Sequence, residues 1–175
     1  MPSQLDKVLD GVNERDRAFY LALQNEDDLG MVVRAHIHIE HELRSFIQAA
    51  APAPQHLKFS EMDFDATVRL AMVLGLHAEF QRPLMHLGSL RNKFSHRLDM
   101  KIGDEEANNF YEALGPAAKR AAQHSFAQVQ KDEPGKHPNN FRKLPAKDRL
   151  LVSLISLRGG ILIELVRVLG KLDEV

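Results

Sequence analysis

The sequence predicts an all-α protein, a single-domain bundle of about six helices. Apolar residues recur at steps of three and four in nearly every periodic segment, and no segment shows the alternation typical of strands. Glycines and prolines such as Pro52, Pro54, Gly115 and Pro116 fall between these segments, where they end helices. At 175 residues the chain is long enough for one domain, residues 1–175, with a full hydrophobic core.

The first part of the chain predicts two helices. An N-terminal helix occupies most of residues 1–27, with Ser3 as its capping residue. A second helix begins after Asp27, where a helix N-terminus favours an anion, and runs to about Ala50. It stops there because the Ala-Pro-Ala-Pro stretch at 51–54 removes backbone donors and favours an extended chain.

Two further helices are expected in the middle of the chain. Asp63 or Asp65 caps a helix that ends around Gly75. A central amphipathic helix follows, with Pro83 in its first turn, where proline is tolerated. Its inward side chains repeat at steps of three and four, namely Phe80, Leu84, Leu87, Leu90 and Phe94.

The last third predicts a helix from Gly103 to the stop signal at 114–116, and another helix to about residue 130. Residues 131–147 form an irregular basic loop with three prolines, and a long apolar helix spans 148–172. This helix is apolar nearly all round, so we expect it at the centre of the bundle or in a homodimer interface. Gly160 in its middle suits close approach by a neighbour.

Composition excludes several classes of protein. The formal charge of −1 excludes a generally cationic nucleic-acid binder but leaves room for a local basic patch. The chain has no cysteine, so disulfides, thiolate zinc sites and a catalytic cysteine are excluded. The first residues lack the features of a signal peptide, and charges interrupt the most apolar segment. We therefore expect a cytoplasmic protein without a membrane partner.

The candidate site lies at the end of the central helix, where Arg91, Asn92, Ser95 and His96 follow the apolar pattern. A guanidinium and an imidazole can bind or cut a phosphodiester, and they can equally cap a helix and hold its neighbours. Residues five apart are turned by about 140° on a helix, so Arg91 and His96 do not share a face. They meet one ligand only if the helix ends near Ser95, the arginine reaches around, or a second protomer completes the site.

The second helix offers two carboxylates and three histidines. Glu40 and Glu42 are candidates to position Arg91 across the helix interface, with solvent exposure as the alternative. The histidines at 36, 38 and 41 do not form the His-Glu-x-x-His pattern, and we interpret them as packing residues rather than metal ligands. The sequence predicts no metal site and no cofactor.

The basic loop at 131–147 carries Lys131, Lys136, Arg142, Lys143 and Lys147. Such a loop can track a phosphate backbone, but with prolines interspersed and Phe141 as its one aromatic residue, we favour a solvated loop.

Three stretches together resemble the mannitol operon repressor-like family. They are residues 28–47 (DLGMVVRAHIHIEHELRSFI), 66–76 (ATVRLAMVLGL) and 90–96 (LRNKFSH). The likeness covers roughly residues 28–115, and the order and spacing of the three stretches carry it. It implies a regulator of sugar-operon expression in a helical fold without an obvious DNA-reading helix.

The Arg-Asn-x-x-x-His pattern at 91–96 also resembles HEPN (higher eukaryote and prokaryote nucleotide-binding) domains. These are helical bundles that commonly dimerise, and their catalytic members are metal-independent endoribonucleases. The resemblance implies Arg91 and His96 as the active pair and Asn92 as its orienting neighbour. If the site is catalytic, His96 moves the 2′-hydroxyl proton and Arg91 stabilises the developing charge.

These observations favour a regulatory or interaction protein. We expect it to act on a protein or nucleic-acid partner through the region from Arg91 to His96, and to form a homodimer. The alternative is a toxin-like endoribonuclease that uses Arg91 and His96. These observations do not decide whether the chain is an enzyme. The hypothesis that we favour, a regulatory or interaction protein, does not require catalysis.

Overall fold

The computed structural model describes residues 17–97, 99–132 and 134–172. Within these ranges the chain forms seven α-helices and no strand, which confirms the all-α prediction. The first of these helices spans residues 17–24, and the expected capping residue Ser3 lies outside the described residues. The others are α2 (Asp28–Ala50), α3 (Phe64–Val73), α4 (Gln81–Ser95), α5 (Asp104–Ala113), α6 (Pro116–Asp132) and α7 (Ala146–Leu172). Short 3-10 turns join them at η1 (Pro54–His56), η2 (Phe59–Glu61), η3 (Ala78–Phe80) and η4 (Phe141–Lys143).

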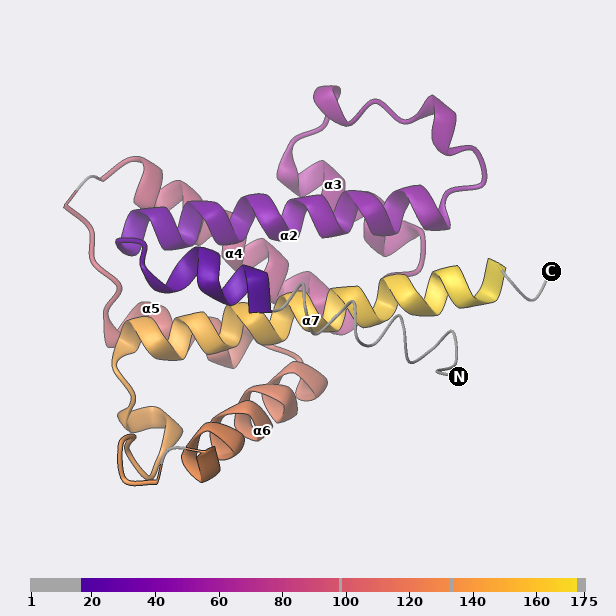
Figure 1. Cartoon of the computed structure of the whole chain (residues 1–175). Coiled ribbons are helices and arrows are strands. Elements are labelled where there is room, and N and C mark those ends of the chain that lie inside the picture. Colours follow the sequence, from indigo (N-terminus) through magenta and orange to yellow (C-terminus); the bar gives the residue numbers. More distant parts are fainter. Residues whose placement is uncertain (1–16, 98, 133, 173–175) are drawn as a thin grey trace.

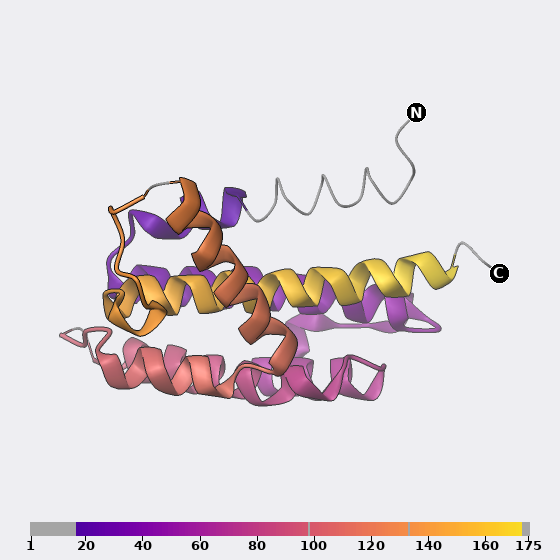
Figure 2. The same ribbon diagram turned by 90° about the horizontal axis from the view of Figure 1, so that it is seen from below.

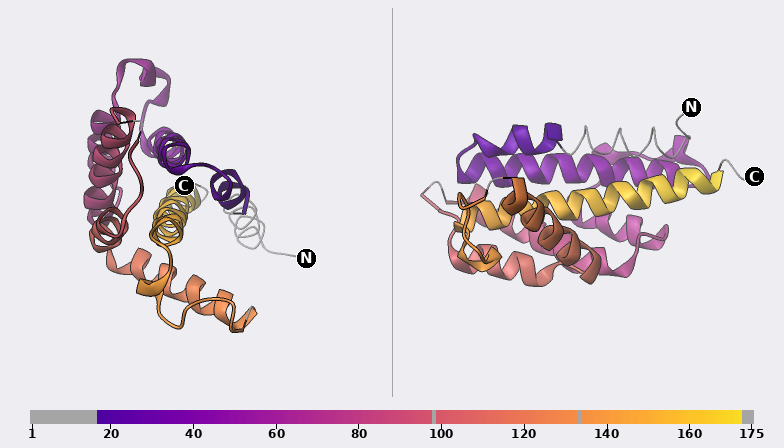
Figure 3. Two further views of the ribbon diagram at one scale, coloured as in Figure 1. Left: turned by 90° about the vertical axis from the view of Figure 1, so that its left-hand side faces the viewer. Right: turned by 60° about the horizontal axis from the view of Figure 1, so that its bottom comes forward.

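Four helices make up the centre of the bundle. They pack in a closed ring, α2 on α4, α4 on α5, α5 on α7 and α7 on α2. α3 packs against α2 and α4, and α6 packs against α7. Figure 1 shows α2 and α7 side by side with α4 and α5 behind them. In Figure 2 and in the right-hand view of Figure 3, α6 crosses α7 obliquely.

The helix starts follow from their capping residues. The Asp27 carboxylate accepts a hydrogen bond from the Gly30 amide at 2.6 Å and caps α2. Of the two candidate caps for α3, Asp63 is the one used, because its carboxylate accepts from the Ala66 amide at 2.7 Å. The expected ends of α2 and α5 are also found, at Ala50 and Ala113.

α7 packs against α2, α5 and α6 and therefore lies at the centre of the bundle. This is one of the two positions expected for it, the other being a homodimer interface. Leu150, Leu154, Leu157 and Ile161 are fully buried. A Cβ at Gly160 would lie 2.8 Å from a ring carbon of Phe80, so the glycine does permit close approach. The neighbour that approaches is an aromatic ring of η3.

The described part of the basic loop is tied to the bundle. Phe141 of η4 is buried, and α7 begins two residues before the expected start of the last helix. The Lys147 ammonium donates to the Glu26 carbonyl and lies 3.7 Å from the Asp28 carboxylate. These contacts argue against a loop whose cations all lie free to follow a phosphate backbone. No helix among the described residues is long and apolar enough to cross a lipid bilayer.

Candidate functional site

The packing of α4 decides which of its side chains face solvent. One side of the helix is buried against the bundle and carries the expected apolar repeat, Leu84, Leu87, Leu90 and Phe94, together with Gly88. Because these positions recur at steps of three and four, the intervening polar residues point outwards. Arg91, Asn92, Ser95 and His96 are accordingly all exposed.

Arg91 lies on the part of the α4 surface that faces α2. Its Nη1 donates to the Asn92 Oδ1 at 3.1 Å, so the neighbouring amide orients the guanidinium. Its charge also reaches α2, where burial first and then Arg91 lower the pKa of His36, against the opposing effect of Glu40. The charge of Arg91 therefore acts on a residue of α2, the helix that packs against α4.

His96 follows the last residue of α4 as its C-cap, with αR backbone angles of φ −99° and ψ −2°. The helix therefore ends at Ser95, which meets one of the conditions for Arg91 and His96 to share a ligand. The backbone still continues the helical path to His96, so its side chain leaves the axis about 140° from that of Arg91. No hydrogen bond joins Arg91 and His96.

Neither Ser95 nor His96 has a side-chain hydrogen bond or ion pair with another described residue. Both side chains are exposed, so they fill no space in the core. A side chain that holds a helix end in place needs a partner, such as a carbonyl or a carboxylate. The geometry of His96 therefore gives no support to a role in bracing the fold.

The two carboxylates of α2 lie apart from the Arg91 guanidinium. Glu40 accepts a hydrogen bond from Arg44 at 2.6 Å and lies 3.8 Å from the imidazole of His36. Glu42 forms a buried ion pair with Arg158 of α7 at 2.8 Å.

The expectation that Glu42 positions Arg91 is therefore wrong. Glu42 belongs, like Leu43, to the buried face of α2. Its carboxylate therefore lies in the core, where it contacts α7. It joins two helices and takes no part in the exposed surface. Glu40 is half-buried on α2, and its hydrogen bond goes to Arg44 rather than to Arg91.

The three histidines of α2 contact different neighbours. His36 is buried against the ring of Phe64, with centroids 4.2 Å apart. His38 meets the edge of Phe19 at 5.3 Å, and burial lowers its pKa, with smaller effects from nearby charges. His41 is exposed. Across the described ranges, no group of three or more His, Asp or Glu side chains has the arrangement of a metal site.

Two buried arginines of α7 were not predicted from the sequence. Arg149 and Arg158 are each 4% exposed, although both belong to the most polar residue type. The signal was present in the sequence, since both stand within the apolar repeat of a long helix. A charge in such a stripe needs a partner from another element, and the sequence does not reveal which one.

Three basic side chains, Arg91, Lys93 and Arg97, are exposed at or just after the end of α4. Lys93 is neutralised by Glu106 at 2.8 Å, whereas Arg91 and Arg97 have no ion pair with a described residue. Two guanidiniums, an amide and an imidazole thus lie exposed near one helix end, which suits recognition of an anionic group.

No protein-family model, curated protein or solved structure matches this chain.

Proposed function

We propose that the chain is a regulatory or interaction protein, of the kind that the mannitol operon repressor-like family suggests. It binds a protein or nucleic-acid partner through the surface formed by Arg91, Asn92, Ser95 and His96. The observation that carries the proposal is the exposure of all four side chains. Among the described residues, their one side-chain hydrogen bond joins Arg91 to Asn92. Exposed polar side chains that do not support the core are available to contact a partner.

An anionic group on the partner fits this surface best. The guanidinium of Arg91 presents several donors in a fixed plane, and the amide of Asn92 orients it. Arg97, two residues after the end of α4, adds a second exposed positive charge. Phosphates of a nucleic acid and acidic side chains of a protein both offer the required oxygens.

Site-directed photo-cross-linking tests the proposal. A benzophenone amino acid at Ser95 should give a covalent adduct in cells, and Arg91→Ala in the same chain should reduce the adduct strongly. The same label at Lys143, an exposed residue of η4, serves as the matched control and should give no such adduct. An adduct at Ser95 that does not depend on Arg91, or no adduct at all, would contradict the proposal.

The ribonuclease remains a second candidate because of one observation at His96. Its imidazole is exposed and makes no described hydrogen bond, which leaves both nitrogens free for proton transfer. Arg91 and His96 could act together because α4 ends at Ser95, because the long arginine side chain reaches around, or because a second copy of the chain brings its own α4 end to this surface.

We also propose that the chain forms a homodimer. Two large apolar side chains support this, because Val73 is 81% exposed and Ile163 is 61% exposed. Arg167 of α7 donates to the Gly75 carbonyl at 3.3 Å, which places the end of α3 beside the last turns of α7. Light scattering should give twice the mass of the chain, and Ile163→Asp should shift it towards a monomer. A monomeric wild type would remove this part of the proposal.

A further inference from the structure

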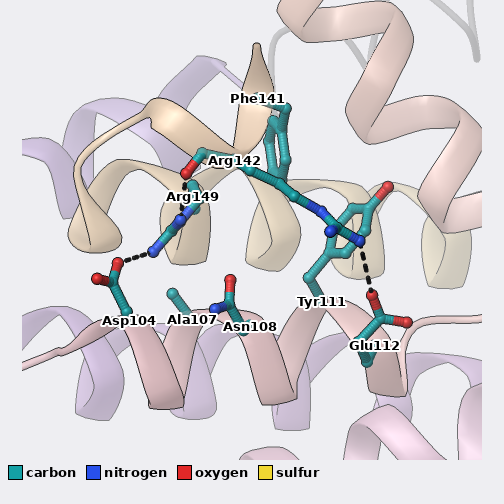
Figure 4. Close-up of a pocket in the computed structure, with 8 residues that line it drawn as sticks. All are labelled: Asp104, Ala107, Asn108, Tyr111, Glu112, Phe141, Arg142 and Arg149. Carbon is teal, nitrogen blue, oxygen red and sulfur yellow. Dashed lines mark hydrogen bonds and ion pairs between the residues drawn. The ribbon is translucent and has the colours of Figure 1, made fainter.

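A cavity of about 360 Å³ lies between α5, η4 and the start of α7, away from α4. Figure 4 shows Asp104, Asn108 and Tyr111 on α5 below the cavity, with Arg142 and Arg149 above it. Its walls come from segments about forty residues apart in the chain, and Asn140 fixes one of them by accepting from the Arg142 amide at 2.9 Å. The cavity is therefore a product of the fold.

Arg149 places a buried positive charge at one end of this cavity. Its side chain is 5% exposed, and it donates to the Arg142 carbonyl at 2.5 Å and to the Asp104 carboxylate. Its Nε is buried and has no partner among the described residues. Asp104 is 81% exposed, so water surrounds most of the carboxylate that balances this charge. A hydrated carboxylate compensates a buried cation only in part.

Arg142 supplies a second positive charge at the opening. Figure 4 shows its side chain extending over the cavity from the Arg149 end towards Tyr111 and Glu112. The side chain is 76% exposed, and its ion pair with Glu112 is long, at 3.8 Å. Glu112 is also held by Lys119, at 3.0 Å. Arg142 can therefore leave Glu112 and turn into the cavity without leaving that carboxylate unpaired.

The charges around the cavity are balanced in number but not in position. Its lining includes two arginines, Arg142 and Arg149, and two acids, Asp104 and Glu112. Both carboxylates are more than half exposed and can face water, whereas the Arg149 guanidinium cannot. The interior is therefore positive, because the only buried charge of the lining is a cation. A bound anion would be stabilised there by the buried positive charge, and a cation would be repelled.

The remaining walls suit an organic body attached to the anion. The rings of Tyr111 and Phe141 lie 5.0 Å apart and form an apolar side. The Asn108 amide is exposed at the floor and makes no described hydrogen bond, so it can donate to an oxygen of the ligand. Each part of such a ligand would meet a matching group.

We propose that this cavity binds a small organic anion, with its carboxylate or phosphate between Arg149 and Arg142 and its body against Tyr111 and Phe141. The site is separate from the Arg91 surface and does not depend on its function. Arg149 gives the fixed charge, and Arg142 closes over the bound group. Asn108 contributes a hydrogen bond from the floor.

Titration calorimetry of the full chain at low ionic strength tests this site. Phenyl phosphate and benzoate are the two anionic probes, and benzyl alcohol is their neutral counterpart. At least one anion should bind saturably with one site per chain, and the alcohol should not. A preference between the two anions distinguishes a phosphate ligand from a carboxylate ligand. Absence of saturable binding by both anions would overturn the proposal.

Three variants locate the binding. Arg142→Gln should weaken the preferred probe by about tenfold, as expected for a lost charged hydrogen bond. Asn108→Asp, which keeps the shape of the side chain and adds a negative charge, should weaken it at least as much. Lys143→Gln removes a neighbouring exposed charge outside the cavity and should leave the affinity unchanged. Binding that Arg142→Gln and Asn108→Asp leave intact, or that Lys143→Gln reduces equally, would contradict the assignment.

Discussion

At the scale of single residues, the pair of Glu42 and Arg158 is the most deeply buried ion pair between described residues. Their side chains are 8% and 4% exposed, and the guanidinium also lies 4.9 Å from the ring of Phe19. The two residues are separated by 116 positions in the chain. Sequence reasoning placed Glu42 on the right helix but gave it the wrong partner, because periodicity shows which face is buried and not which element covers it.

Glu42→Gln should lower the free energy of unfolding by about 3 kcal/mol, because it removes the negative charge that pairs with the buried Arg158 guanidinium across α2 and α7. Glu40→Gln is the matched control, since Glu40 stands on the same helix and its partner Arg44 is about one third exposed. That change should cost about 0.5 kcal/mol. Urea unfolding measures both, and equal losses would show that the buried pair is not the stronger link.

His36 makes stability depend on pH. Burial lowers its pKa below 6.5, so the folded protein resists a proton that the unfolded chain accepts. The stabilisation is fully present above about pH 6.5 and is lost as the pH falls towards the lower folded pKa. Burial also lowers the pKa of His38 and of His86, so both residues likewise make the folded state less stable as the pH falls.

The free energy of unfolding should therefore fall as the pH is reduced from about 7 to about 5. His36→Gln should make that decrease smaller, because it removes one of the titrating groups. Urea unfolding at a series of pH values measures the slope. An unchanged slope in the variant would show that His36 titrates alike in the folded and unfolded states.

At the scale of elements, helix ends were predictable because they depend on neighbouring residues. Asp27 and Asp63 each accept a hydrogen bond from the amide three positions later, and proline follows the end of α2. The cavity beside α5 was not predictable, because it requires η4 and Arg149 to meet a helix distant in sequence. The sequence left open whether Arg91 and His96 brace the fold or face a ligand, and the structure shows both side chains exposed at the end of α4.

Two glycines of α7 test how closely η3 approaches that helix. A Cβ at Gly160 would lie 2.8 Å from the Phe80 ring, whereas at Gly170 it would meet nothing within 4 Å. Gly160→Leu should therefore cost about 1 to 3 kcal/mol through overpacking. Gly170→Ala should be neutral or should stabilise by up to about 1 kcal/mol, as alanine does in a helix. Thermal unfolding measures both, and a stabilising Gly160→Leu would disprove the close contact.

At the scale of the whole molecule, the closed ring of α2, α4, α5 and α7 leaves the end of α4 on the outside of the bundle. The chain thus combines a core that uses its buried charges internally with an exposed polar surface from Arg91 to His96. If that surface only braced the fold, Arg91→Ala and His96→Ala would each lower stability. Because both side chains are exposed, we expect melting temperatures close to that of the wild type.

Incubation of the purified chain with mixed RNA in the presence of a chelator tests the central claim most directly. Binding without catalysis predicts intact RNA for the wild type and for His96→Ala, Arg91→Ala and the nearby control Arg97→Ala. Cleavage by the wild type that leaves 2′,3′-cyclic phosphate ends would contradict this account. The contradiction would be complete if cleavage were lost in His96→Ala and Arg91→Ala but kept in Arg97→Ala, since removal of one charge-stabilising donor commonly costs about a hundredfold in rate.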